Sequence, residues 1–142
     1  MLTPSIHSIY NWDVDVPSNL DGLTFMPMLW GSKNEAQFKQ TVVAGFAPIA
    51  LGMNEWVLSR FPSFVFSLPP SRVNEPSQAN MSPPDGYTMW VNDMEPLSSQ
   101  GYMLGSPSVT NDDSGMQWLQ EFMQTCNGGC HVRHLFNGSQ SI

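Results

Sequence analysis

An apolar run, Pro48-Ile49-Ala50-Leu51-Gly52, ends at the polar group Met53-Asn54-Glu55. A short apolar run bounded by turn residues is typical of a buried strand in a parallel sheet. An aromatic, proline-containing segment, 56–72, follows, and Val73-Asn74-Glu75-Pro76 then repeats the Asn-Glu pair. Functional side chains of parallel α/β proteins gather after the carboxyl ends of strands. A glutamate there is a candidate acid or base, and the adjacent asparagine is a candidate donor to a substrate hydroxyl.

Further strands and helices alternate on both sides of this run. Strands are expected at 5–10, 23–30 and 102–107, with a fifth beginning at 131–132. Pro27 is awkward inside a central strand and predicts a bulge or a strand end there. Helices are expected at 34–43, with Ser32 or Asn34 as cap, at 87–97, and from 113 or 114 to the Asn127-Gly128-Gly129 stop signal. This alternation predicts an α/β fold with parallel strands.

The periodicity of apolar residues predicts the buried side of each helix. The predicted set comprises Ala36, Phe38 and Val42 or Val43 in the first helix, Met89, Trp90, Asp93, Met94 and Leu97 in the second, and Met116, Leu119, Phe122 and Met123 in the third. A complete eightfold barrel needs roughly 200 residues or more. The 142 residues could therefore supply only part of one.

Composition narrows the classes of partner. Twelve acidic residues against five basic ones give a formal charge of −7, which argues against nucleic acid and anionic membranes as partners. No apolar run is long enough for a membrane span, and the first residues lack the features of a signal peptide. A neutral carbohydrate is compatible with this charge. No cofactor is expected.

Aromatic and cysteine residues leave alternatives open. Trp12 and Trp30 follow expected strands, so they could line a sugar-binding cleft or pack beneath loops, whereas Trp90 and Trp118 are expected in the core. Cys126 and Cys130 could form a disulfide, remain two thiols, or join His131 and His134 around zinc. So compact a ligand cluster is poor zinc geometry, and no metal site is predicted.

An ordered series of motifs resembles the catalytic domain of glycoside hydrolase family 128, which includes fungal endo-β-1,3-glucanases. The series comprises Tyr10-Asn11-Trp12, Pro27 to Gly31, Leu51-Gly52, Asn74-Glu75-Pro76, Ser77 to Pro83, Trp90, Pro96-Leu97, Ser106-Pro107, Thr110-Asn111, Trp118-Leu119, Phe122, Cys126 and Cys130.

The resemblance implies a (β/α)8 barrel, of which this chain would hold about strands two to six, and a retaining mechanism with two glutamates. Such carboxyl groups lie about 5 Å apart. Glu75 is the first choice for the acid/base and Glu55 the second. Substrate-binding positions would be Asn74, Asn54, Asn11, Trp12, Trp30 and Asn111.

The chain also departs from the family pattern. Removing either 53–72 or 56–75 restores an uninterrupted Leu-Gly-x-Asn-Glu-Pro motif, so an insertion or retained intron is expected near 53–72. The tail at 131–142 diverges, and the strand with the second glutamate is not recognisable, so the nucleophile is expected to be absent.

The sequence therefore predicts one incomplete glycosyl hydrolase catalytic domain over 1–142. Its substrate would be β-1,3-glucan of fungal cell walls, its location extracellular or in the wall, and the chain alone would be inactive. The alternative is a non-catalytic glucan-binding or structural wall protein.

Overall fold

The computed structural model describes residues 7–54, 81–109 and 112–134. The strands are β1 (Ser8–Tyr10), β2 (Thr24–Met26), β3 (Ile49–Leu51), β4 (Met103–Gly105) and β5 (Val132–His134). The helices are α1 (Glu35–Thr41), α2 (Pro83–Met89), the π-helical turn η1 (Trp90–Met94), α3 (Glu95–Ser98) and α4 (Asp113–Cys126). Each expected strand and helical region is represented, in the expected order.

The strands pair in parallel and in sequence order. β1 pairs with β2, and β3 pairs with β4, which pairs with β5. A parallel bridge between Met28 and Leu51 connects the two groups. The prediction of an α/β fold with parallel strands is confirmed.

Pro27 marks the point where the second strand changes partner. β2 ends at Met26, and the Pro27 carbonyl then accepts a hydrogen bond from the Leu51 amide, 2.9 Å away. A proline can accept but cannot donate in a strand ladder. The expected strand over 23–30 is therefore divided, with its first part beside β1 and its continuation beside β3.

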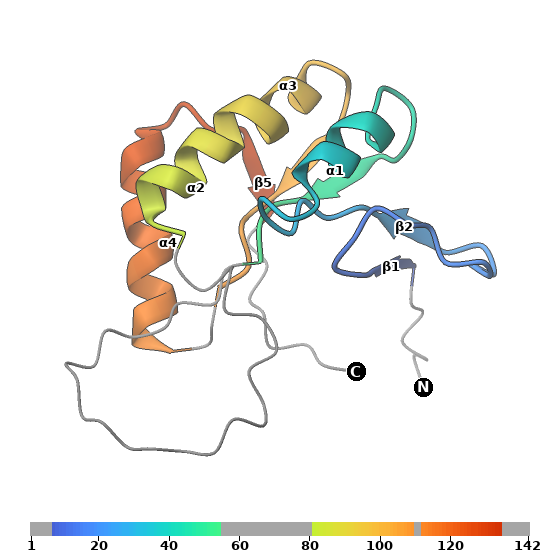
Figure 1. The fold of residues 1–142 in the computed structure, drawn as a ribbon, viewed down its shortest axis with the longest axis horizontal. Coiled ribbons are helices and arrows are strands. Elements are labelled where there is room, and N and C mark those ends of the chain that lie inside the picture. The colour runs from blue at the N-terminus through green and yellow to red at the C-terminus, as the bar shows by residue number, and fades with distance from the viewer. Residues whose placement is uncertain (1–6, 55–80, 110–111, 135–142) are drawn as a thin grey trace, which may run out of the picture.

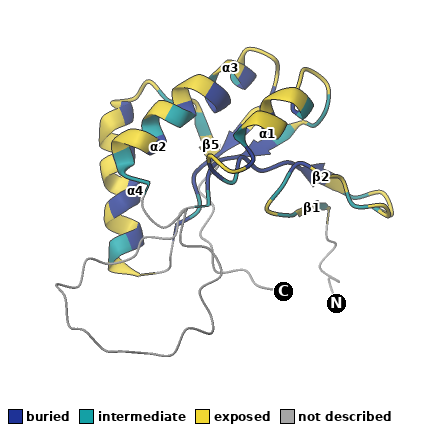
Figure 2. Ribbon diagram, viewed as in Figure 1, coloured by how far each residue is buried: buried dark blue, intermediate teal, exposed yellow. Residues whose placement is uncertain are grey.

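The helices cover one side of β3 to β5, as Figure 1 shows. Ala50 and Leu104 point to this side and belong to the same apolar cluster as Phe38, Trp90 and Phe122. Figure 2 shows these helices with buried residues on one side and exposed residues on the other. Phe122 packs against Trp90 edge-on at 5.7 Å and stacks on Trp118 at 5.5 Å between ring centroids. The prediction that both tryptophans pack in the core is confirmed.

The opposite side of the strands carries a smaller apolar cluster. Met26, Met28 and Leu51 form it, with the half-buried Trp30 and Ile49 packed against them. Side chains of neighbouring residues in a strand point to opposite faces, so Leu51 faces away from Ala50 and from the helices.

Three expected core residues are exposed instead. Met116 is 53% exposed and Met123 39%, because the buried stripe of α4 follows Gly115, Trp118, Leu119, Phe122 and Cys126. This stripe has the spacing of one helix face, and the two methionines lie beside it. In α1 only Phe38 is buried and Ala36 is exposed; of the alternatives Val42 and Val43, Val42 is the buried one.

The second helical region begins earlier than expected. Ser82 caps α2 by accepting a hydrogen bond from the Asp85 amide, and Pro83 and Pro84 occupy its first positions. Proline is tolerated there because the first helical amides have no partner within the helix. The Pro-Pro-Asp-Gly sequence, which precedes the expected helix over 87–97, is therefore the first turn of α2.

The turn between α4 and β5 is closed by a disulfide. Asn127 ends α4 in the left-handed conformation, as the stop signal predicts, and Cys126 is bonded to Cys130. Of the three alternatives for these cysteines, the disulfide is therefore present, and neither sulfur is a thiolate available to zinc. Within the described ranges, no helix is long and apolar enough to cross a membrane.

Candidate active site

The carboxyl ends of the strands lie at one edge of the sheet and are held together by backbone hydrogen bonds. The Asn54 amide, after β3, donates to the Trp30 carbonyl at 3.3 Å, and Asn54 forms a parallel bridge with Ser108, after β4. The Met28 amide donates to the Asp13 carbonyl, after β1, at 3.1 Å. Predicted site residues from three different strands are thus gathered in one region.

Asn11 shapes the turn that follows β1. Its Nδ2 donates to the Asp15 carbonyl at 2.8 Å, and its Oδ1 accepts from the Asp13 amide at 3.1 Å. Part of its hydrogen-bonding capacity is therefore used within the chain. Its neighbour Trp12 is 63% exposed and offers a large apolar ring at the surface of the same turn.

Trp30 is partly buried at the end of the second strand. Its ring packs against the cluster of Met26, Met28 and Leu51, and the Lys33 ammonium lies 4.8 Å from the ring centroid. A cation at this distance from a tryptophan face is attracted by the ring. The ring is therefore fixed in place more firmly than that of Trp12.

Asn34 is a site residue that the sequence did not reveal. It was expected only as a possible helix cap, but its side chain caps nothing. Instead its Oδ1 accepts from the amides of Trp30 (2.9 Å) and Gly31 (3.4 Å), and its Nδ2 donates to the Met28 carbonyl (3.0 Å) and to Asp13 Oδ1 (3.4 Å). An asparagine after a strand was the available signal, but its partners could not be inferred from it.

The exit of β3 is closely packed. Met53 is fully buried in the helix-side core, and its carbonyl accepts from the Ser108 amide at 2.7 Å. A Cβ on Gly52 would lie 2.9 Å from both the Pro107 nitrogen and a carbon of the Trp90 ring. The chain therefore passes Trp90 at Gly52 and reaches the site edge at Asn54.

Four predicted site residues lie outside the described ranges: Glu55, Asn74, Glu75 and Asn111. The segment 56–72 and most of the tail beyond β5 lie outside them as well. Their assignments stay predictions.

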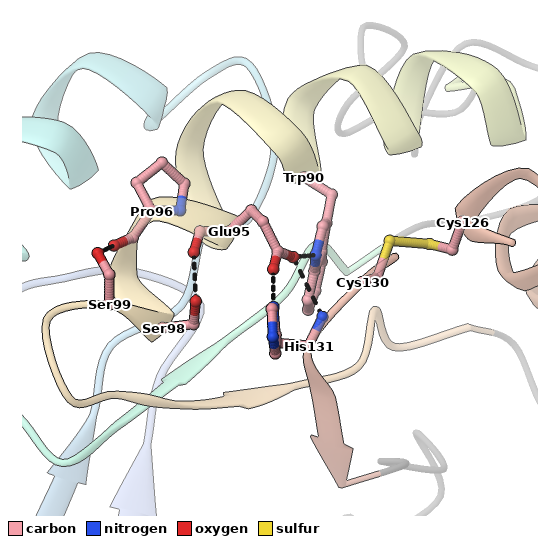
Figure 3. Close-up of polar contacts among 8 residues, drawn as sticks. All are labelled: Trp90, Glu95, Pro96, Ser98, Ser99, Cys126, Cys130 and His131. Atoms are coloured by element: carbon pink, nitrogen blue, oxygen red, sulfur yellow. Dashed lines mark hydrogen bonds and ion pairs between the residues drawn. A yellow bond between two sulfur atoms is a disulfide. The ribbon is translucent and has the colours of Figure 1, made fainter. Parts of the chain in front are cut away.

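The carboxylate of Glu95 is held at the opposite edge, as Figure 3 shows. Its Oε2 accepts from the indole nitrogen of Trp90 (2.8 Å) and from the His131 amide (3.2 Å), and its Oε1 contacts His131 Nδ1. Because His131 directly precedes β5, this cluster lies where the parallel strands begin. Burial raises the pKa of Glu95, but the hydrogen bonds from His131 and Trp90 outweigh burial and hold that pKa below its ordinary value.

An ion pair joins α1 to the π-helical turn on the outer helix layer. Lys39 Nζ lies 2.7 Å from both Asp93 Oδ1 and Glu35 Oε1, and the Asp93 side chain is almost fully buried. Burial raises the pKa of Asp93 more than the Lys39 ammonium lowers it. The pair borders a cavity of about 180 Å³ between these helices. Since it lies among helices and not at strand ends, it is separate from the candidate active site.

The family model described as the glycosyl hydrolase catalytic core matches residues 2–136. A comparison with curated proteins gave no match.

Several solved structures of glycoside hydrolase family 128 are similar to the chain. A curdlan-specific exo-β-1,3-glucanase of subgroup III from Blastomyces gilchristii is 28% identical, with a TM-score of 0.66 over 89% of this chain and 49% of that one. A subgroup I endo-β-1,3-glucanase from Amycolatopsis mediterranei, in complex with laminaripentaose, is 25% identical, with a TM-score of 0.55 over 89% and 45%. An oligosaccharide-binding protein of subgroup VII from Trichoderma gamsii, 24% identical with a TM-score of 0.55 over 81% and 42%, shares the fold.

The chain spans about half the length of these structures or less. The family model nevertheless covers almost all of the chain, and the similar solved structures come from several subgroups of one family. The chain belongs to the glycosyl hydrolase catalytic core family and, with these structural relatives, to glycoside hydrolase family 128.

Proposed function

We propose that the chain is part of the (β/α)8 catalytic barrel of a retaining β-1,3-glucan hydrolase, from about strand two to strand six. Five parallel strands in sequence order, with helices on one side, support this proposal. So does the match to about half of the Blastomyces gilchristii exo-β-1,3-glucanase. The segment 53–72 is then an insertion or retained intron, and 131–142 is a divergent end of the domain.

The observation that carries the proposal is the hydrogen bond between the Asn54 amide and the Trp30 carbonyl. It joins the end of the strand that carries Trp30 to the strand exit at Asn54. We assign the acid/base role to Glu75, with Asn74 as its neighbour, and keep Glu55 as the second choice. Only one of the two glutamates can occupy the position, since the family has one acid/base.

Glucan would be bound along the strand exits. Trp12 and Trp30 offer apolar faces to sugar rings, and Asn11, Asn54 and Asn111 offer amide groups to hydroxyls. The neutral polymer needs no charged partner, which agrees with the low content of basic residues. We therefore propose β-1,3-glucan as the binding partner.

Retaining hydrolysis needs a second carboxylate about 5 Å from the first. Among the described residues near the strand exits, Asp13 accepts hydrogen bonds from the Val14 amide and Asn34, and Asp15 accepts one from Gln37. Glu95 lies at the opposite edge, and Glu121 is on α4, bonded to Gln117. None of these described carboxylates is assigned the role, and we propose that the nucleophile lies outside this chain, which alone would then bind glucan without cleaving it.

We place the protein outside the cell or in the cell wall, where its substrate would be found. The disulfide between Cys126 and Cys130 supports this location, because such bonds persist mainly in oxidising compartments.

Sequencing of the spliced transcript is the first test. A transcript that lacks codons 53–72 and extends into a strand with a second glutamate supports the hydrolase. A transcript that ends with these 142 residues and includes 53–72 overturns the catalytic part of the proposal and favours a glucan-binding or structural wall protein.

The second test measures binding and cleavage together. The intact chain is incubated with curdlan and laminaripentaose, and bound protein and released reducing ends are quantified. We expect binding without release, and the absence of binding would overturn the proposed function. If the protein encoded by the spliced transcript releases reducing ends, Glu75→Gln should abolish that release. Glu121→Gln, on the exposed side of α4, should not.

A further inference from the structure

Asn34 has its full hydrogen-bonding capacity satisfied at a strand exit. An asparagine amide offers two donors and two lone pairs. Its two acceptor positions are filled by the amides of Trp30 and Gly31, and its two donors by Met28 and Asp13. The residue is 7% exposed, so these bonds are made away from bulk water.

A role in capping α1 does not account for this arrangement. A capping asparagine accepts from an amide in the first turn of its own helix. Asn34 stands at the cap position but makes no such bond. The side chain is turned back toward the end of the second strand instead, which favours a function at the strand exit over one in the helix.

This arrangement holds the backbone of Trp30 on both sides. Its amide donates to Asn34 Oδ1 at 2.9 Å, and its carbonyl accepts from the Asn54 amide at 3.3 Å. Both sides of its backbone are therefore fixed, one by a side chain and one by the neighbouring strand exit. With the backbone fixed, the orientation of the ring depends mainly on its own two side-chain torsions and its contacts.

We infer that Asn34 is a positioning residue for glucan binding, which holds Trp30 in register with the Asn54 strand exit. This inference rests on the proposed function, and it assigns a residue that does not itself contact the sugar. Truncating Asn34 removes the acceptor of the Trp30 amide, so the sugar-binding ring loses its fixed orientation. The other strand exits keep their structure.

A double-mutant cycle on the intact chain tests the inference. Binding of laminaripentaose is measured for the parent, Asn34→Ala, Trp30→Ala and the double variant. Each single variant should raise Kd by about tenfold, the equivalent of one lost hydrogen bond or ring contact. The double variant should bind no more weakly than Trp30→Ala, because Asn34 acts through that ring. A double variant whose defect is the product of the two single defects would overturn the inference.

Asn19→Ala serves as the matched control. Asn19 is exposed, and its side chain donates to Asp21 at the surface. It should leave Kd unchanged. Urea unfolding of every variant establishes that the compared chains are folded, and Asn34→Asp, which retains the two acceptor positions, provides a second variant should Asn34→Ala not fold.

A spectroscopic readout separates this inference from the proposed function. The near-ultraviolet circular dichroism of Trp30 is obtained by subtracting the spectrum of Trp30→Phe from that of the parent, without any sugar. The same difference, taken in the Asn34→Ala background, should be reduced, whereas Asn34→Asp, which keeps the acceptor for the Trp30 amide, should retain it. An unchanged difference in Asn34→Ala, or a lost one in a folded Asn34→Asp, overturns the positioning role even if glucan binds. If the parent chain does not bind laminaripentaose, the proposed function fails, and the spectra alone decide whether Asn34 orients Trp30.

Discussion

Replacing Glu95 with alanine should destabilise the chain through the loss of three contacts at the amino-terminal edge of the sheet. The indole N–H of Trp90, whose side chain is fully buried, would lose its acceptor at 2.8 Å. The amide and the ring of His131 would also lose their contacts with the Glu95 carboxylate. The largest part of the cost comes from Trp90, because its ring is fully buried whereas His131 is exposed.

The magnitude follows from the exposure of the partners. A buried donor left without an acceptor costs about 1–3 kcal/mol. The Glu95 side chain is 21% exposed and His131 is 62% exposed, so the His131 contacts add only about 0.5–1 kcal/mol. We therefore expect Glu95→Ala to lower the free energy of unfolding by about 1.5–4 kcal/mol. Glu95→Gln keeps an acceptor for Trp90 and should cost about 1 kcal/mol.

Urea unfolding of the oxidised chain at pH 7, followed by tryptophan fluorescence, measures these differences. Glu121→Ala and Glu121→Gln are the matched controls, because Glu121 is exposed on α4, where its carboxylate accepts from Gln117 and its carbonyl accepts from Thr125. Both should fall within about 0.5 kcal/mol of the parent. A value for Glu95→Ala inside the same interval would refute the argument that Trp90 depends on this carboxylate.

Acidification independently tests the direction of the pKa shift of Glu95. The pKa of Glu95 is lower in the folded state than its ordinary value, so its contribution is complete above the unfolded pKa of about 4.3 and is lost as the pH falls through the folded pKa. The difference in unfolding free energy between the parent and Glu95→Gln should therefore shrink below about pH 5. A difference that grows on acidification would contradict the assigned direction.

Two further substitutions test other parts of the fold. Gly52→Ala should cost about 1–3 kcal/mol and lower the thermal midpoint, because the new Cβ would meet the Pro107 backbone and the Trp90 ring at 2.9 Å; an unchanged midpoint would show that the strand exit can adjust. Cys130→Ser should lower the unfolding free energy by about 2 kcal/mol, the loop-closure value for a disulfide spanning only 126–130. Equal urea midpoints for the oxidised parent and this variant would contradict that value.

The local pattern of the sequence predicted the elements but not the contacts between them. The alternation of strands and helices and the Asn127-Gly128 stop signal depend on neighbouring residues, and both are present in the structure. The observed buried face of α4 differs from the predicted one. It includes Gly115 and Cys126, which are small and do not contribute to a pattern of large apolar residues. Gly86 lies against the Trp118 ring, a contact across α2 and α4 that composition cannot indicate.

The candidate site could likewise be predicted from the sequence only in part. Asn11, Trp12, Trp30 and Asn54 were predicted from their places after strands, and the structure brings these strand ends to one edge. The partners of Asn34 include a residue 21 positions away, and those of Glu95 include one 36 positions away. Such pairs are set by the docking of whole elements, so no local signal distinguishes them from ordinary surface side chains.

Trp90 links the two edges of the sheet physically. Its indole N–H is bound by Glu95 where the strands begin, and another part of its ring lies against Gly52, just before the exit to Asn54. In parallel barrels the residues at strand beginnings mainly stabilise the fold, whereas those at strand exits carry the chemistry. Because one rigid ring spans from one region to the other, a disturbance at Glu95 can reach the exit of β3 by moving that ring against Gly52. Stability and the geometry of the strand exit before Asn54 therefore depend on the same side chain.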